Sequence, residues 1–215
     1  MDLRERFDVV ETPVEVAGHR WTLLHPRSAE ALISEPDFEK DERLPYWADL
    51  WPSSRVLADV LARHHGNGRR ALELGCGSGL VACALASAGY AVTASDYYHE
   101  ALAFTAENVR RACGVEIATM HLDWRTLPDE LPMWDLVVGA DVLYERPYGE
   151  IVAGVLDRTV APGGAAIIAD PGRIALEPFM DAARVRGLTL DEGWEVPWAQ
   201  EGQRHTVRVR VLVRR

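Results

Sequence analysis

The sequence predicts an α/β fold with a mostly parallel sheet, because apolar runs of strand length alternate with helical segments from about residue 68 onward. The run "WDLVVGA" (134–140) is apolar almost throughout, as expected of a strand that is covered on both faces. Valine and arginine alternate over residues 207–213, which is typical of a strand with one buried and one exposed face.

The same patterns predict the elements in chain order. Strands are expected over residues 71–74, 90–95, 115–120, 134–140 and 165–170. Helices are expected over residues 80–88, 99–113, 148–159 and 177–186, the first ended by Gly89 and the second by Gly114. Apolar segments over 188–196 and 206–213 have no helix between them, so we expect an antiparallel hairpin at the sheet edge.

We divide the chain into an N-terminal extension, 1–44, and a main domain, 45–215. The extension should contain a strand or hairpin in "VEVAGHRWTLLHP" and a short helix in "SAEALIS" capped by Ser28. A further helix should begin near Pro52 and Ser53, because apolar residues follow at helical spacing. The aromatic cluster Tyr46, Trp47 and Trp51 lies just before it, and core packing is the favoured interpretation of its two tryptophans.

Composition narrows the function classes. The net charge of −10 argues against an extended nucleic-acid surface, which would need many Lys and Arg contacts, and suits a cationic partner better. No apolar run approaches the roughly 20 residues of a membrane span, and the charged start "MDLRERFDVVE" does not resemble a signal peptide. We therefore expect a soluble, cytoplasmic protein. Its three cysteines lack metal-ligand spacing, so we expect reduced thiols and no metal site.

The stretch "ELGCGSG" (73–79) carries the strongest functional signal. Glycines in a strand-to-helix turn let a ligand approach the backbone closely. A dinucleotide site would read G-x-G-x-x-G, but here the third glycine comes one residue early and Glu73 precedes the first. That carboxylate would repel a pyrophosphate and attract an ammonium or sulfonium group, so the loop suits a cationic ligand.

With these residues the sequence resembles the class I, seven-β-strand S-adenosylmethionine-dependent methyltransferases, whose hallmark is E/D-x-G-x-G-x-G. The resemblance implies a Rossmann-like, doubly wound sheet. It also implies that Glu73 contacts the methionine end of the cofactor, that Asp96 accepts from both ribose hydroxyls, and that Tyr97, Asp123 and Trp124 surround the adenine. The cofactor-binding residues that the resemblance implies are Trp51, Glu73, Gly75, Cys76, Gly77, Gly79, Asp96, Tyr97, Asp123, Trp124 and Ala140.

Less universal residues indicate the branch. The stretch "GADVLYE" (139–145) should follow the fourth strand and lacks the prolines that DNA and RNA amino-methyltransferases carry there. Together with "PYWADLWPSSRVLA", "DW" and "ADPGR", it looks like the protein lysine methyltransferase branch that includes the electron-transfer-flavoprotein β-subunit lysine methyltransferases. The resemblance implies that Asp141 and Tyr144 are the catalytic residues and face the acceptor. "DPGR" (170–173) either closes the other side of the site or is simply a turn.

The resemblance predicts methyl transfer to a lysine amine of a protein substrate. A lysine ammonium, with a pKa of about 10.4, must lose a proton before its nitrogen can attack. We assign Asp141 the orientation of that amine and an electrostatic role, because a carboxylate also stabilises the charged form. A small-molecule N-methyltransferase and a non-catalytic cofactor-binding interaction module are the alternatives.

Overall fold

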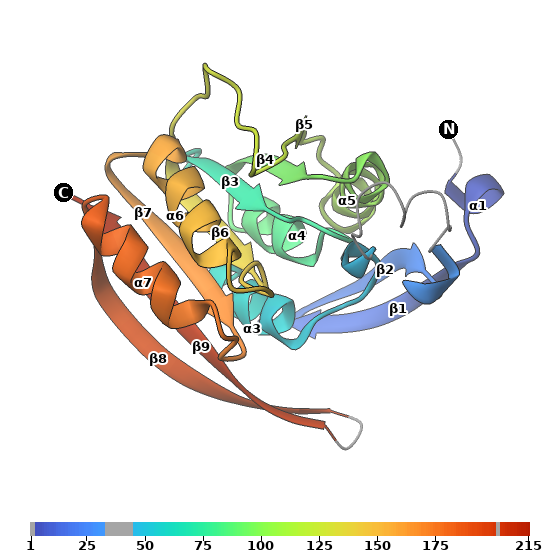
Figure 1. The fold of residues 1–215 in the computed structure, drawn as a ribbon. Coiled ribbons are helices and arrows are strands. Elements are labelled where there is room, and N and C mark those ends of the chain that lie inside the picture. Colours follow the sequence, from blue (N-terminus) through green and yellow to red (C-terminus); the bar gives the residue numbers. More distant parts are fainter. Residues whose placement is uncertain (1–2, 33–44, 201–202) are drawn as a thin grey trace.

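In this computed structural model, which describes residues 3–32, 45–200 and 203–215, a seven-stranded sheet lies between two layers of helices (Figure 1). The strand order is β5-β4-β3-β6-β7-β9-β8. The strands are β3 (Arg70–Leu74), β4 (Ala91–Asp96), β5 (Ala118–His121), β6 (Trp134–Ala140), β7 (Val160–Asp170), β8 (Leu188–Gln200) and β9 (Gln203–Arg214). The pairs from β5 to β7 are parallel and those of β9 are antiparallel, so the predicted sheet is confirmed.

The two helix layers bury opposite faces of the sheet. One layer holds α3 (Pro52–Leu61), α4 (Leu80–Ser87) and α5 (His99–Cys113), and the other holds α6 (Tyr148–Thr159) and α7 (Leu176–Val185). Neighbouring residues of β3 divide accordingly: Ala71 belongs to the first core, and Leu72 belongs to the second. Strands buried on both faces lose the apolar-polar alternation, which explains the continuous apolar run of β6.

Some boundaries differ from the predictions. β5 begins at Ala118, three residues later than expected, and Val115 is exposed in the connection that follows Gly114. β7 begins at Val160, directly after α6, and its register with β6 shifts between Trp134 and Leu136. Periodicity could not locate these starts, because both lie in connections whose path depends on the neighbouring strand.

The C-terminal hairpin forms the predicted sheet edge and extends beyond the body of the sheet (Figure 1). β7 pairs with β9 as far as Asp170 opposite Arg208, whereas β8 and β9 remain paired to Gln200 opposite Gln203. Val207 and Val209 are fully buried while Arg208 and Arg210 are partly exposed, which confirms the alternation read from the sequence.

The N-terminal segment contains α1 (Leu3–Arg6) and an antiparallel pair, β1 (Val9–Val16) and β2 (His19–Pro26). Side chains of both strands join the core beneath α3, α4 and α5. Only a 3-10 turn, η1 (Glu30–Leu32), forms where a helix was expected, and Ala29 precedes it. Ser28 as the cap of this helix stays a prediction; residues 33 and 34 of the predicted helix lie outside the described residues.

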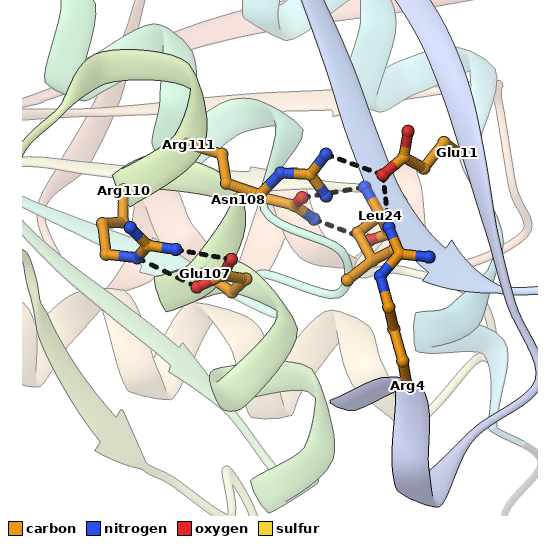
Figure 2. Close-up of polar contacts among 7 residues, drawn as sticks. All are labelled: Arg4, Glu11, Leu24, Glu107, Asn108, Arg110 and Arg111. Carbon is orange, nitrogen blue, oxygen red and sulfur yellow. Dashed lines mark hydrogen bonds and ion pairs between the residues drawn. The ribbon is translucent and has the colours of Figure 1, made fainter. Parts of the chain in front are cut away.

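A buried amide joins this hairpin to the rest of the protein. Asn108 of α5 is fully buried, and its Nδ2 donates to the carbonyls of Leu24 (2.7 Å) and Ser78 (2.8 Å). Its Oδ1 accepts from the Leu24 N–H at 2.8 Å. Figure 2 shows this contact beside Glu11 of β1, which pairs with both Arg4 and Arg111. Asn108 thus holds β2, the glycine loop and α5 in one network.

The three cysteines are free, with Cys76 and Cys83 buried and Cys113 half-buried. No helix in the described part of the chain is long and apolar enough to cross a membrane.

Replacing Asn108 tests the network. Asn108→Ala should lower the free energy of unfolding by about 2–4 kcal/mol, because it leaves the Leu24 amide and the Ser78 carbonyl buried without partners. Denaturant titration measures the change. Arg110→Ala on the same helix is the control, since its pair with Glu107 is exposed and should be worth less than about 1 kcal/mol. Equal losses in the two variants would contradict the assignment.

Candidate functional site

A cavity of about 410 Å³ opens at the carboxyl ends of β3, β4 and β6. This volume lies within the roughly 300–1,000 Å³ of small-molecule sites. The structure brings all the predicted site residues to its wall: Trp51, Glu73, Gly75, Cys76, Gly77, Gly79, Asp96, Tyr97, Asp123, Trp124, Ala140, Asp141 and Tyr144. Parallel strands place the residues that follow them at one edge of the sheet, so distant motifs converge there.

The glycine loop connects β3 to α4, and its glycines all have left-handed φ, but a Cβ would clash with the backbone at only two of them. Gly77 has φ +52°, and a Cβ there would lie 2.9 Å from the Trp47 carbonyl oxygen. Gly79 has φ +86°, and a Cβ there would lie 2.7 Å from Thr105 Cα. The sequence predicted the close approach of a ligand at all three glycines. Gly75 alone fits that reason without a backbone clash, because its Cβ would meet the Trp124 ring at an ordinary 3.4 Å.

Glu73 is buried at the end of β3, with its side chain at the cavity wall. Burial, and secondarily the charge of Asp96, raises the pKa of Glu73 well above its usual range. Its Oε2 has no hydrogen-bond partner among the described residues. A buried carboxylate oxygen without a partner is costly, so this position favours a ligand with a positive, hydrogen-bonding group.

Asp96 ends β4 and is held rigidly. Its Oδ2 accepts from the Gly77 N–H and its Oδ1 from the Tyr98 N–H, both at 3.0 Å. Burial raises the pKa of Asp96, and the hydrogen bonds from Tyr98 and Gly77 oppose that shift. The carboxylate is thus fixed in one orientation and keeps lone pairs for a hydroxyl-bearing ligand. Asp123 is oriented in a similar way, because its Oδ1 accepts from the Arg125 N–H at 3.0 Å.

Asp141 follows β6 in an unusual conformation. Its φ of +58° is left-handed, a region that residues other than glycine adopt infrequently and often at functional sites. Its N–H donates to the Ala169 carbonyl at 2.9 Å, which ties it to β7. Oδ1 pairs with Arg173 Nε at 2.6 Å, whereas the buried Oδ2 has no partner in the described part of the chain. The second oxygen therefore remains available to a ligand.

Arg173 also lines the cavity, although it was not among the residues predicted to form the site. The stretch "DPGR" is a turn, in which Asp170 Oδ1 accepts from the N–H groups of Gly172 and Arg173, both at 2.7 Å. It also closes the cavity through Arg173, so both interpretations of that stretch are correct. The sequence predicts that Asp141 and Arg173 each follow a strand. Only the structure shows that these two strands, β6 and β7, are neighbours and bring the side chains together.

Aromatic rings form a continuous row on the cavity wall. The centroids lie 5.9 Å apart for Trp51 and Tyr46, 6.2 Å for Tyr46 and Tyr144, 4.2 Å for Tyr144 and Tyr148, and 6.0 Å for Tyr148 and Trp124. Tyr46 is 43% exposed. Core packing, predicted for the two tryptophans, is confirmed for Trp47, which is buried against Phe104, and is wrong for Trp51, which is half-buried and lines the cavity.

Residues 38–178 match the model of a family described as lysine methyltransferase. The chain belongs to that lysine methyltransferase family. It is 33% identical over 138 residues to the electron transfer flavoprotein beta subunit lysine methyltransferase of Xenopus laevis, covering 60% of this chain and 53% of that protein. It is 30% identical over 131 residues to the protein N-lysine methyltransferase METTL21A of Danio rerio, covering 56% and 60%. The chain thus spans between half and two thirds of each relative.

Solved structures identify the fold. The N-methyltransferase NodS of Bradyrhizobium japonicum WM9, in complex with S-adenosylhomocysteine, superposes with a TM-score of 0.62 at 17% identity, covering 86% of this chain and 95% of NodS. Magnesium protoporphyrin IX methyltransferase of Synechocystis PCC 6803, with bound S-adenosylmethionine, gives 0.60 at 16% identity, covering 84% and 92%. The family match confirms the predicted lysine methyltransferase family, and the superposed structures confirm the Rossmann-like fold.

Glu73→Gln should affect stability and cofactor binding in opposite directions. Because the pKa of Glu73 is raised in the folded protein, the wild type holds a proton that the unfolded chain loses, and its stability should fall as pH rises above the usual carboxyl range. The variant should lack this loss and be more stable at pH 8 by about 1 kcal/mol or more. Denaturant titrations at pH 5 and pH 8 measure the difference.

The same variant should bind S-adenosylhomocysteine about tenfold more weakly or worse, since the ligand's ammonium loses its carboxylate partner. Isothermal titration calorimetry measures this affinity. Glu116→Gln makes the same charge change at an exposed position and serves as control. Loss of both stability and binding would indicate that Glu73 is a structural residue.

Proposed function

We propose that this protein transfers a methyl group from S-adenosylmethionine to a lysine side-chain amine of a protein substrate. One observation carries the proposal. Two buried carboxylate oxygens without partners in the described structure, Glu73 Oε2 and Asp141 Oδ2, line the same cavity from the ends of the adjacent strands β3 and β6. A site with two such oxygens is suited to two cationic or N–H-bearing groups, one from the cofactor and one from the acceptor.

The residues of the cavity fit the cofactor. Glu73 would take its ammonium group, Asp96 would accept from the ribose hydroxyls, and Gly75 leaves room for its close approach. When bound, the cofactor supplies a sulfonium methyl that is electrophilic without further activation. The remaining predicted binding residues complete the wall: Trp51, Cys76, Gly77, Gly79, Tyr97, Asp123, Trp124 and Ala140.

On the acceptor side, the protein's main contribution is positioning. Asp141 Oδ2 can accept an N–H of the amine and direct its lone pair, with the left-handed backbone fixing the carboxylate. Tyr144, together with Tyr46 and Tyr148, presents aromatic faces that exclude water and can pack against the alkyl chain of a lysine. Methyl transfer would then be governed by alignment, with Asp141 as an orienting group.

A protein substrate is supported by the relatives and by charge. Both relatives described above are named as lysine methyltransferases, one of a flavoprotein subunit. The net charge of −10 suits a basic segment around the target lysine and opposes a nucleic-acid backbone.

Transfer of label tests the proposed activity. The purified protein is incubated with methyl-labelled S-adenosylmethionine and a cell extract, and proteins, nucleic acids and small molecules are separated before counting. We expect label in a protein band, and peptide mapping should place it on lysine. Label confined to small molecules would favour the small-molecule N-methyltransferase, and no label with intact cofactor binding would contradict catalysis.

Asp141→Asn tests the acceptor side. Asparagine keeps the size of the side chain and tolerates the left-handed backbone, so the fold and the affinity for S-adenosylhomocysteine should remain close to wild type. Turnover should fall on the order of 100-fold, because the amine loses its orienting group. Initial rates on the labelled substrate, compared with the exposed control Glu150→Gln, measure the effect. Unchanged turnover would remove Asp141 from the mechanism.

A further inference from the structure

We infer that Arg173 is a positioning residue that compensates the charge of Asp141, so that the acceptor site receives a neutral amine in preference to an ammonium. The inference rests on the proposed function and assigns this function's specificity to one ion pair. The observations that carry it are the geometry of the pair, the charges of the cavity and the construction of the turn that presents Arg173.

The ion pair restrains one carboxylate oxygen of Asp141 and leaves the other available to a ligand. Arg173 Nε contacts Asp141 Oδ1 at 2.6 Å, and the guanidinium lies over the Trp51 ring, 5.6 Å from its centroid. Asp141 Oδ2 is buried and has no partner in the described structure. The guanidinium therefore holds the carboxylate from one side, and the free oxygen can accept a hydrogen bond from an incoming N–H.

Arg173 differs in the sign of its charge from the carboxylates that line the cavity. Among the described residues that line it, Arg173 is the one arginine or lysine, against six carboxylates: Asp49, Glu73, Asp96, Asp123, Asp141 and Glu145. A wall of carboxylates alone would favour a charged ammonium over a neutral amine. Arg173 offsets that preference at the one place where the amine must be neutral.

The turn that presents Arg173 is built from buried and closely packed groups. Asp170 is fully buried at the end of β7, and its Oδ1 holds the Gly172 and Arg173 N–H groups. Gly172 has φ +89°, and a Cβ there would collide with the Arg208 guanidinium of β9. Arg208 is itself paired with Glu195 of β8 at 3.1 Å. The guanidinium of Arg208 on β9 therefore lies against the turn that carries Arg173.

The chemistry of methyl transfer requires that the attacking amine be neutral. The amine lone pair forms the new N–C bond while the C–S bond breaks and its electron pair stays on sulfur, so an ammonium has no electrons to contribute. An unpaired carboxylate would raise the pKa of the bound amine and thereby oppose its deprotonation. A carboxylate paired with Arg173 can still orient an N–H group but stabilises the ammonium less.

Binding of two cofactor analogues tests the inference without requiring turnover. Sinefungin carries an amino group, protonated at neutral pH, where the cofactor carries the transferable methyl, and S-adenosylhomocysteine carries nothing there. Calorimetry at pH 7 gives the affinity of each for wild type and variants. Arg173→Gln should raise the preference for sinefungin over S-adenosylhomocysteine about tenfold or more, because Asp141 is left uncompensated.

Three further variants distinguish an effect of the charge of Arg173 from an effect on the structure of the site. Arg173→Lys retains a cation and should return the preference toward wild type. Asp141→Asn should lower it below wild type, and this measurement keeps the test decisive if Arg173→Gln fails to fold. Arg184→Gln makes the same net-charge change at an exposed position of α7 and should leave the preference unchanged.

An unchanged preference in Arg173→Gln, including equal weakening of both analogues, would overturn the inference and indicate that Arg173 contacts the cofactor or only supports the turn. A protein that transfers no label but shows the expected shift in preference would contradict the proposed function and leave the charge compensation intact.

Discussion

The buried amide of Asn108 is the interaction on which the arrangement of the site depends. It bonds to both backbone groups of Leu24 and to the Ser78 carbonyl, so one side chain fixes an N-terminal strand and the glycine loop against α5. The neighbouring Thr105 donates to the Gly77 carbonyl at 3.0 Å, one turn earlier on the same helix. Buried backbone groups must be paired, and side chains of α5 supply the partners of two carbonyls in this loop, those of Gly77 and Ser78. The helix that covers the sheet is therefore also the element that shapes the loop.

Strand order explains why the crevice forms where it does. β3 pairs with β4 on one side and with β6 on the other, so the chain leaves β3 in one direction and returns to the opposite side of it later. In open parallel sheets the connections diverge at such a switch point and leave a crevice beyond the carboxyl ends. Glu73 ends near this point and Asp141 follows the strand beside it, which brings two carboxylates from distant parts of the sequence to one cavity.

Folding stability and ligand binding favour different surroundings for these carboxylates. Glu73 and Asp141 each keep one buried oxygen without a partner in the described structure, and Asp141 also has a left-handed backbone. Such groups destabilise a fold and persist at sites where a ligand completes them. The surrounding layers, with apolar cores on both faces of the sheet, offset this cost.

Local patterns were sufficient to predict the elements and the motif. The bounds of β6, α5 and α6 follow from hydrophobic periodicity and from Gly114, and the glycine loop with Glu73 indicated a cationic ligand before any contact was known. Periodicity and turn chemistry act over a few residues, so one sequence contains them in full. The pair of Asp141 and Arg173, 32 residues apart, the buried bonds of Asn108 and the exposure of Tyr46 were decided only in the tertiary structure. Each of these depends on which strands become neighbours and how far a side chain can reach across them, and such distances are not encoded in the spacing of residues along the chain.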